Sequence, residues 1–204
     1  MAHSDPLPDE VAKYLASQIA VVSRDLPTAT PRPARKKGAA GGAAVAGPLP
    51  NRELTESFAI WTLRDEAVTK PNTNLTELAH ETGRWHHQVK VAGVPASFAR
   101  STPLGPAPDH WRVNAFFDSP IARKIDQAIT WIDENVKNDP LVRLLVAPSY
   151  HLHAFWLEKD GVNTVVVADM PPNFKALRYE KPYNSEEFLL ALSQEQHITG
   201  LTFG

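Results

Sequence analysis

The chain has 204 residues, of which 43% are hydrophobic and 22% charged, and both fractions are ordinary for a globular protein. This composition argues against a collagen-like, disordered or heptad-repeat protein, and the length favours one large domain. Because the chain contains no cysteine, disulfides, thiolate metal sites and cysteine nucleophiles are excluded together. The net charge of −2 provides no general attraction to nucleic acid.

The hydropathy pattern gives no indication of a membrane protein. No apolar stretch approaches the roughly 18 residues needed to cross a bilayer, and the first residues lack the basic start and apolar core of a secretory signal. We therefore expect a cytoplasmic protein without a membrane partner.

Residues 1–25 predict an amphipathic helix. Pro8 suits a first helical position, and the helix should run to about Arg24. Four apolar residues recur every three or four positions along one side of it: Val11, Leu15, Ile19 and Val22. A helix this short is marginal alone in water, so its apolar side needs a cover. Two alternatives stay open: the helix packs on the chain's own core, or it docks on a protein partner or a second copy.

Residues 26–51 predict a flexible linker. The stretch is rich in proline, and residues 38–47 consist of Gly, Ala and one Val, with no large side chain to bury. Ordering one residue's backbone costs about 1–2 kcal/mol, which so little apolar surface does not offset. The main basic cluster, Arg32 to Lys37, lies in this stretch without an aromatic residue on which a base could stack. We therefore expect a solvated linker and consider nucleic-acid binding unlikely.

Residues 52–204 predict a single α+β domain. Alternating and helical hydrophobic patterns, read with proline and glycine positions, indicate its elements. The first half should contain, in chain order, a strand or short helix over 58–68, a helix over 74–82 ended by Gly83, a strand over 85–91 forming a hairpin with 94–100, a loop over 101–109, and a strand over 111–117.

The second half of this domain has the clearest signals. Ser119 and Pro120 begin a long helix with an apolar stripe that ends near Val136. It should be followed by strands over 141–147, 150–158 and 162–168, and by a last helix from Ser185 to about Gln194. The strand over 150–158 is apolar on both sides, which predicts a central place in the sheet. The expected fold is a largely antiparallel sheet, made of a hairpin plus one strand and then a three-strand meander, packed with the long helix and a C-terminal helix.

Several catalytic signatures are absent from the sequence. It contains no phosphate-binding loop, no dinucleotide-binding glycine pattern, no nucleophile elbow and no Ser-x-x-Lys pair. His80-Glu81 begins like a zinc-protease helix, but Arg84 stands where the second ligand would be. We therefore expect no cofactor.

Histidines are the remaining candidates for chemistry. His151 and His153 should lie on one side of a strand about 6.6–7 Å apart, a spacing that suits metal chelation. His87, facing the apolar side of its own strand, could be a third ligand, with Asp169 or Asp118 as a carboxylate. These histidines are thus candidate catalytic residues, and with Asp169 they are candidate ligands for zinc or another divalent metal. The alternative is structural, since neighbouring hydroxyl and carbonyl groups could satisfy both rings.

Trp131 is a further candidate, because it lies away from the apolar stripe of its helix and exposed tryptophans often mark interfaces. Taken together, the order helix, linker, domain and the absence of catalytic motifs favour a non-catalytic binding or assembly module. Such a module would contact its partner, or a second copy, through the N-terminal helix. The alternatives are a small metal-dependent or histidine-dependent hydrolase using the His-x-His strand, and a weak nucleic-acid binder using the basic linker.

Overall fold

The computed structural model describes residues 3–4, 7–22, 52–64, 74–91, 93–118 and 120–195. These residues form an α+β fold around one large, mostly antiparallel sheet with the strand order β5-β4-β3-β2-β6-β7-β8-β9. The α+β class and the largely antiparallel sheet are confirmed. The predicted linker, residues 26–51, lies outside the described residues.

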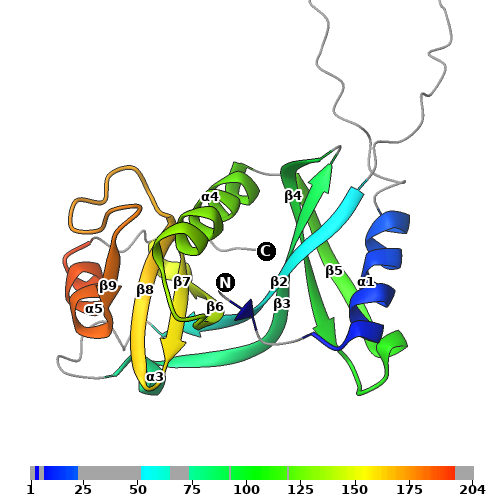
Figure 1. The fold of residues 1–204 in the computed structure, drawn as a ribbon, viewed down its shortest axis with the longest axis horizontal. Coiled ribbons are helices and arrows are strands. Elements are labelled where there is room, and N and C mark those ends of the chain that lie inside the picture. The colour runs from blue at the N-terminus through cyan, green and yellow to red at the C-terminus, as the bar shows by residue number, and fades with distance from the viewer. Residues whose placement is uncertain are drawn as a thin grey trace, which may run out of the picture.

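One half of the sheet is a continuous antiparallel set. It consists of β2 (Arg52–Leu63), β3 (Ala79–Val91), β4 (Val94–Pro103) and β5 (Trp111–Asp118). Strands β2 and β3 are long and curve along the base of the molecule, from the side of helix α1 (Asp9–Val22) towards the side of helix α5 (Ser185–Ser193) (Figure 1). Their pairing changes register between Leu54 and Ser57 and again between Ala59 and Trp61, and such bulges bend a sheet.

The other half begins where β2 pairs in parallel with β6 (Leu141–Ala147). Strands β7 (Leu152–Lys159), β8 (Val162–Asp169) and β9 (Pro182–Asn184) follow, all antiparallel. A two-residue strand, β1 (His3–Ser4), also pairs in parallel with β6. The predicted three-strand meander is therefore present, and the parallel pairing to β2 joins it to the first half.

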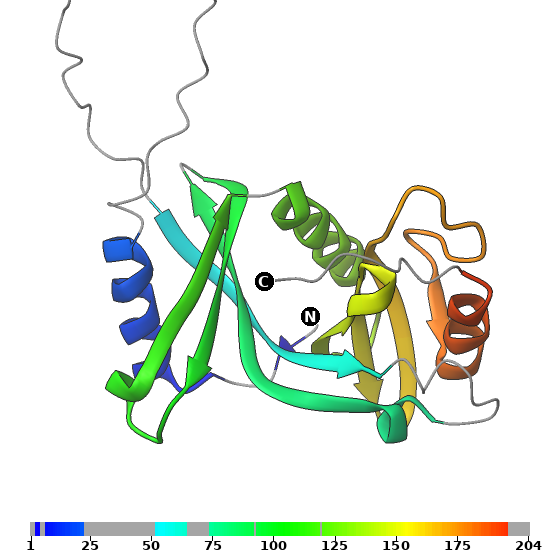
Figure 2. The ribbon, with the colours of Figure 1, turned by 180° about the vertical axis from the view of Figure 1, so that it is seen from behind.

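Four α-helices pack around the sheet in the described residues: α1 (Asp9–Val22), α3 (Leu75–Leu78), α4 (Pro120–Asn135) and α5 (Ser185–Ser193). Figure 2 shows α1 at the outer side of β4 and β5, α5 at the opposite end beside β9, and α4 between the two halves of the sheet. The apolar stripe of α4, which includes Ile125 and Ile132, is buried against Phe58, Leu144 and Phe155.

Strand β7 is covered on both faces. Phe155 and Leu157 lie in the cluster under α4, while Ala154 and Trp156 lie in the cluster that contains Phe188 of α5. Its neighbours are β6 and β8, so the predicted central position of this strand is confirmed.

Helix α1 packs on the chain's own sheet. Val11 and Leu15 are buried against Trp111 of β5, and Ile19 is buried against Val89 of β3. A partner could reach these apolar side chains only if the helix left the sheet. The side chain of Val22 lies outside the described residues.

Several local predictions differ from the structure. The strand or short helix predicted over 58–68 is strand β2, which already begins at Arg52 and ends at Leu63, and β4 extends to Pro103 into the predicted loop. The predicted helix over 74–82 lasts only from Leu75 to Leu78, because the chain then joins β3, where His80 pairs with Thr62 and Ala79 with Leu63. The strand predicted over 150–158 begins at Leu152, because Pro148–Tyr150 form a 3-10 turn, η2, and His151 has a left-handed backbone with φ of 49°. The side-by-side strand geometry expected for His151 and His153 is therefore wrong.

Candidate functional site

A pocket of about 260 Å³ opens where the two halves of the sheet meet, and we call it the arginine pocket. Its polar lining comes from four neighbouring segments: Thr62 of β2, Thr82 and Arg84 of β3, Arg100 of β4, and His151 and His153 at the start of β7. Ile60, Val146, Pro148 and Leu152 provide its apolar lining. The pocket thus combines two guanidinium groups, two imidazoles and two hydroxyls, and no carboxylate belongs to the part of its lining that the structure describes.

The backbone is irregular on each segment that supplies a charged or imidazole group to the pocket. Gly83, between Thr82 and Arg84, has φ of 67°, a conformation that side chains rarely adopt. Register shifts follow Arg100 in the β4–β5 pairing and His153 in the β7–β8 pairing. In a regular strand, successive side chains point to opposite faces of the sheet. These irregularities, together with the left-handed backbone of His151, interrupt that alternation at the pocket and change the direction of the side chains there.

The two arginines repel each other electrostatically. Burial lowers the pKa of Arg100, and the positive charge of Arg84 lowers it further. Arg100 also lies 5.6 Å from the centre of the Phe98 ring, which supports the guanidinium from one side. Within the described residues neither arginine forms a salt bridge to a carboxylate, so this like-charged pair has no neutralising partner there.

A third histidine adjoins the pocket. His86 faces α4, since its neighbour two residues on, Gln88, donates a hydrogen bond from Nε2 to the carbonyl of Ala122 (2.8 Å). The His86 ring stacks on Phe98 and donates from Nε2 to Oε1 of Gln88 (3.2 Å). Burial lowers the pKa of His86 to about 3, and the charges of His153, His87 and Arg100 contribute in the same direction.

His153 is also held neutral. Burial lowers its pKa to about 4, with a further contribution from Arg100, while Asp169 acts in the opposite direction. At pH 7 His153 and His86 therefore act as neutral hydrogen-bonding groups, while the two arginines give the pocket positive charge.

Three buried polar atoms around the pocket have no hydrogen-bond partner in the described part of the chain. They are Nε of Arg100, Nδ1 of His153 and Nδ1 of His86. A buried polar group without a partner costs about 1–3 kcal/mol, and more when it is charged. A ligand that accepts hydrogen bonds would supply a partner for the Arg100 guanidinium.

The sequence candidates separate into two places. His151 and His153 share the arginine pocket, but His87 faces the opposite side of the sheet, as does Val89, which packs on Ile19 of α1. His87 is fully buried between two serine hydroxyls: Nδ1 lies 2.8 Å from Oγ of Ser57 and Nε2 lies 2.6 Å from Oγ of Ser101. This arrangement satisfies the ring inside the core and supports a structural role for His87.

In the described residues, Asp169 does not complete a metal site. Asp169 pairs with His153 across the β7–β8 ladder, but its carboxylate forms an ion pair with Lys124 of α4. Asp118 ends β5, and its side chain lies outside the described residues. Among the residues described, no three His, Cys, Asp or Glu side chains form a group that could hold a metal ion.

Arg84, Arg100 and His86 were not predicted as site residues. Each belongs to a strand with an ordinary alternating pattern, and Arg84 is followed by Trp85 and the two histidines without any known motif. The one local signal was Gly83 beside Arg84, because an isolated glycine within a strand often marks a bulge or a close approach.

No protein-family model matches this chain, and neither a curated protein nor a solved structure shows significant similarity to it. Within the described residues, no helix has the length and apolar character that crossing a bilayer requires.

Proposed function

We propose that this protein is a non-catalytic binding module that holds a small anionic molecule, through a carboxylate or phosphate group, in the arginine pocket. The observation that carries the proposal is the Arg84–Arg100 pair, in which a partly buried Arg100 lies beside an exposed Arg84 and neither charge is neutralised by a described carboxylate. Guanidinium groups form paired, charge-assisted hydrogen bonds with planar oxyanions, and the hydroxyls of Thr62 and Thr82 can add neutral ones.

The size of the pocket limits the ligand. A volume of about 260 Å³ is slightly below the usual range for drug-sized ligands, so it suits one oxyanion with a few attached atoms. The apolar wall formed by Ile60 and Val146 would face the uncharged part of such a molecule.

Binding of inorganic phosphate tests this proposal. At constant ionic strength, phosphate should raise the thermal unfolding midpoint saturably, because a ligand that binds only the folded state stabilises it. Arg84→Gln and Arg100→Gln should each weaken binding about tenfold or more, since a hydrogen bond to a charged group contributes about 1.5–3 kcal/mol. Arg123→Gln, which removes an exposed arginine of α4 outside the pocket, is the matched control and should bind as the wild type does.

The same titration should include acetate and sulfate as further probes. Equal stabilisation of the wild type and both pocket variants by every anion would mean that the anions act through general salt effects, and the proposal would be rejected. Sulfate binding with the arginine dependence described above would support it, because the pocket recognises the oxyanion rather than one compound.

A second prediction concerns how much the adjacent charges of Arg84 and Arg100 reduce the free energy of unfolding. Arg100→Met removes a charge that is desolvated and repelled by Arg84, while it keeps a long apolar stem against Phe98. We expect the unliganded variant to be as stable as the wild type, or more stable by up to about 1 kcal/mol, although it no longer binds phosphate. Urea unfolding without phosphate measures this. A loss of stability above about 1 kcal/mol would assign Arg100 a structural role instead.

The other candidate functions remain predictions. For metal-dependent hydrolysis by His151 and His153, the part of the chain that the structure describes contains no group of three His, Cys, Asp or Glu side chains that could hold the metal, and docking through α1 would need the helix to leave Trp111. The basic cluster from Arg32 to Lys37 lies outside the described residues.

A further inference from the structure

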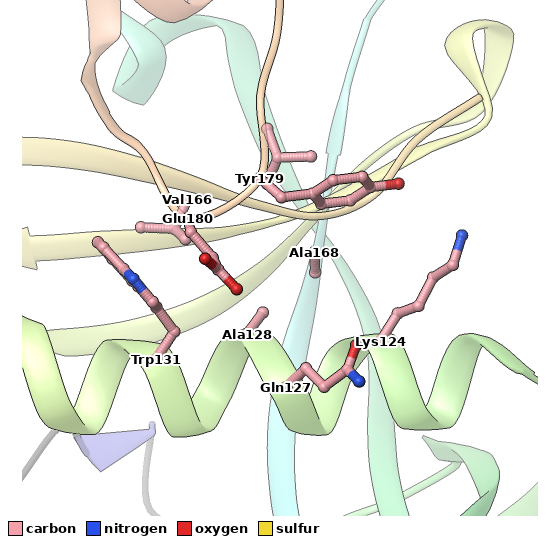
Figure 3. Close-up of a pocket in the computed structure, with 9 residues that line it drawn as sticks. Lys124, Gln127, Ala128, Trp131, Val166, Ala168, Tyr179 and Glu180 are labelled. Carbon is pink, nitrogen blue, oxygen red and sulfur yellow. The ribbon is translucent and has the colours of Figure 1, made fainter. Parts of the chain in front are cut away.

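A second pocket, of about 370 Å³, lies between α4, β8 and the segment that leads from β8 to β9. Figure 3 shows Trp131 and Glu180 together at one end of it, Tyr179 above its middle, and Lys124 at the other end. The small side chains of Ala128 and Ala168 leave space between these groups. We call it the tryptophan pocket.

The charges around this pocket are already partly neutralised. The ammonium of Lys124 forms an ion pair with Asp169 and also interacts with the hydroxyl of Tyr179, so its charge is compensated mainly by that carboxylate. The carboxylate of Glu180 has no salt bridge to any described residue and is aimed into the space beside Trp131 (Figure 3). The unmet charge at the tryptophan end is therefore negative.

The aromatic groups are held by their surroundings. Trp131 is half-buried, and part of its side chain packs against the cluster under α4. The hydroxyl of Tyr179 donates to the carbonyl of Met170 (3.2 Å) and accepts from its backbone N–H (3.3 Å), which anchors the ring at the pocket rim. Glu180 has φ of 56°, so the backbone turns sharply where this carboxylate enters the pocket.

We infer that the tryptophan pocket binds a small organic cation, of the quaternary ammonium class. The faces of indole and phenol rings attract a cation within about 6 Å, and the attraction is larger when the cation is partly desolvated. Apolar methyl groups on such a cation fit the alanine and valine lining, and the Glu180 carboxylate compensates the charge. This site is separate from the arginine pocket and does not depend on the proposed anion ligand.

Choline and its uncharged carbon analogue, 3,3-dimethylbutan-1-ol, provide a matched pair of probes with nearly the same shape. The measurement follows the indole N–H resonances of the full chain by two-dimensional NMR at constant ionic strength, with the Trp131 signal assigned from Trp131→Phe. Choline should shift the Trp131 resonance saturably. The neutral analogue should bind at least about fivefold more weakly, which corresponds to a cation–π contribution near 1 kcal/mol.

Variants of acidic residues distinguish a charge-selective site from an apolar one. Glu180→Gln should weaken choline binding about fivefold or more, whereas Glu134→Gln, which changes an exposed carboxylate of α4 outside the pocket, should leave it unchanged. Equal affinity for choline and the alcohol would overturn the inference, as would choline binding that is insensitive to Glu180→Gln. The Arg84→Gln and Arg100→Gln variants should bind choline as the wild type does, so failure of either site can be recognised independently.

Discussion

Lowering the pH from 7 to 5 should remove a large part of the free energy of unfolding, and the protein should unfold well before the carboxylates are fully protonated. The cause is three buried histidines that the fold keeps neutral. Burial lowers the pKa of His86 to about 3 and the pKa values of His87 and His153 to about 4. In the unfolded chain each should return to the ordinary value of about 6.5.

The direction follows from proton binding. Below pH 6.5 the unfolded chain takes up protons on these three residues, while the folded protein does not until the pH approaches 4. These histidines therefore do not reduce the free energy of unfolding above their unfolded-state pKa. The free energy of unfolding falls as the pH decreases from that value towards their folded-state pKa values. One proton difference contributes about 1.4 kcal/mol per pH unit, so three give at most about 4 kcal/mol per unit near pH 5.

Charged neighbours modify this effect for each ring. Arg100 opposes protonation of both His86 and His153, whereas Asp169 favours protonation of His153. Because burial is the largest cause for all three, salt should change the slope only slightly.

Urea unfolding at pH values from 7 to 5 measures the slope. Each of His86→Gln, His87→Gln and His153→Gln should reduce it by about one third, whatever its effect on absolute stability, because glutamine does not titrate. His80→Gln, which changes an exposed histidine of β3, should keep the wild-type slope. A wild-type stability that stays constant from pH 7 to 5 would show that the rings are not held neutral by burial.

Truncating Leu15 to alanine should reduce stability by about 2–5 kcal/mol, the second large effect expected. Leu15 is fully buried in a cluster with Val11 and Trp111, with Tyr14 and Trp85 packed at its edge. A cavity there is bordered by two tryptophans that face each other edge to face at 6.0 Å, and the surroundings cannot collapse easily around it.

Urea unfolding of Leu15→Ala, compared with Lys13→Ala on the exposed side of α1, tests whether this helix belongs to the core. The Lys13 variant should change stability by less than about 0.5 kcal/mol. Deletion of residues 1–50 should destabilise the protein by at least as much as the Leu15 change, since it uncovers Trp111 and Val89. A truncated chain of unchanged stability would instead support a helix that serves to dock on a partner.

The elements predicted best are those in which local chemistry and packing agree. The helix beginning at Pro120 has a proline start and an apolar stripe, and its buried residues Ile125 and Ile132 belong to that stripe. The strand over 141–147 coincides with β6, since its apolar run has proline before it and after it. The helix predicted over 74–82 stops at Leu78, because residues 79–81 pair with β2 and this long-range pairing outweighs the local helix propensity.

The parallel pairing of β2 with β6 has no local signal. It pairs Ile60 with Leu144, which lie far apart in the sequence. Each of the two strands, taken alone, has an ordinary apolar pattern that does not indicate its partner. The arginine pocket forms at this junction, so its composition also depends on long-range pairing. His151 and His153 were found because they are neighbours in sequence, whereas Arg84 and Arg100 approach each other only through the β3–β4 hairpin and its irregularities.

If Arg84 and Arg100 together bind an oxyanion, as we propose, their guanidinium Nε–H resonances should report it most directly. In a phosphate titration of the full chain at constant ionic strength, followed by nitrogen–proton NMR, both resonances should shift with one shared saturation curve. The signal of the exposed Arg123 should stay in place. Resonances of Arg84 and Arg100 that do not move, or that move linearly together with Arg123 without saturation, would contradict the account.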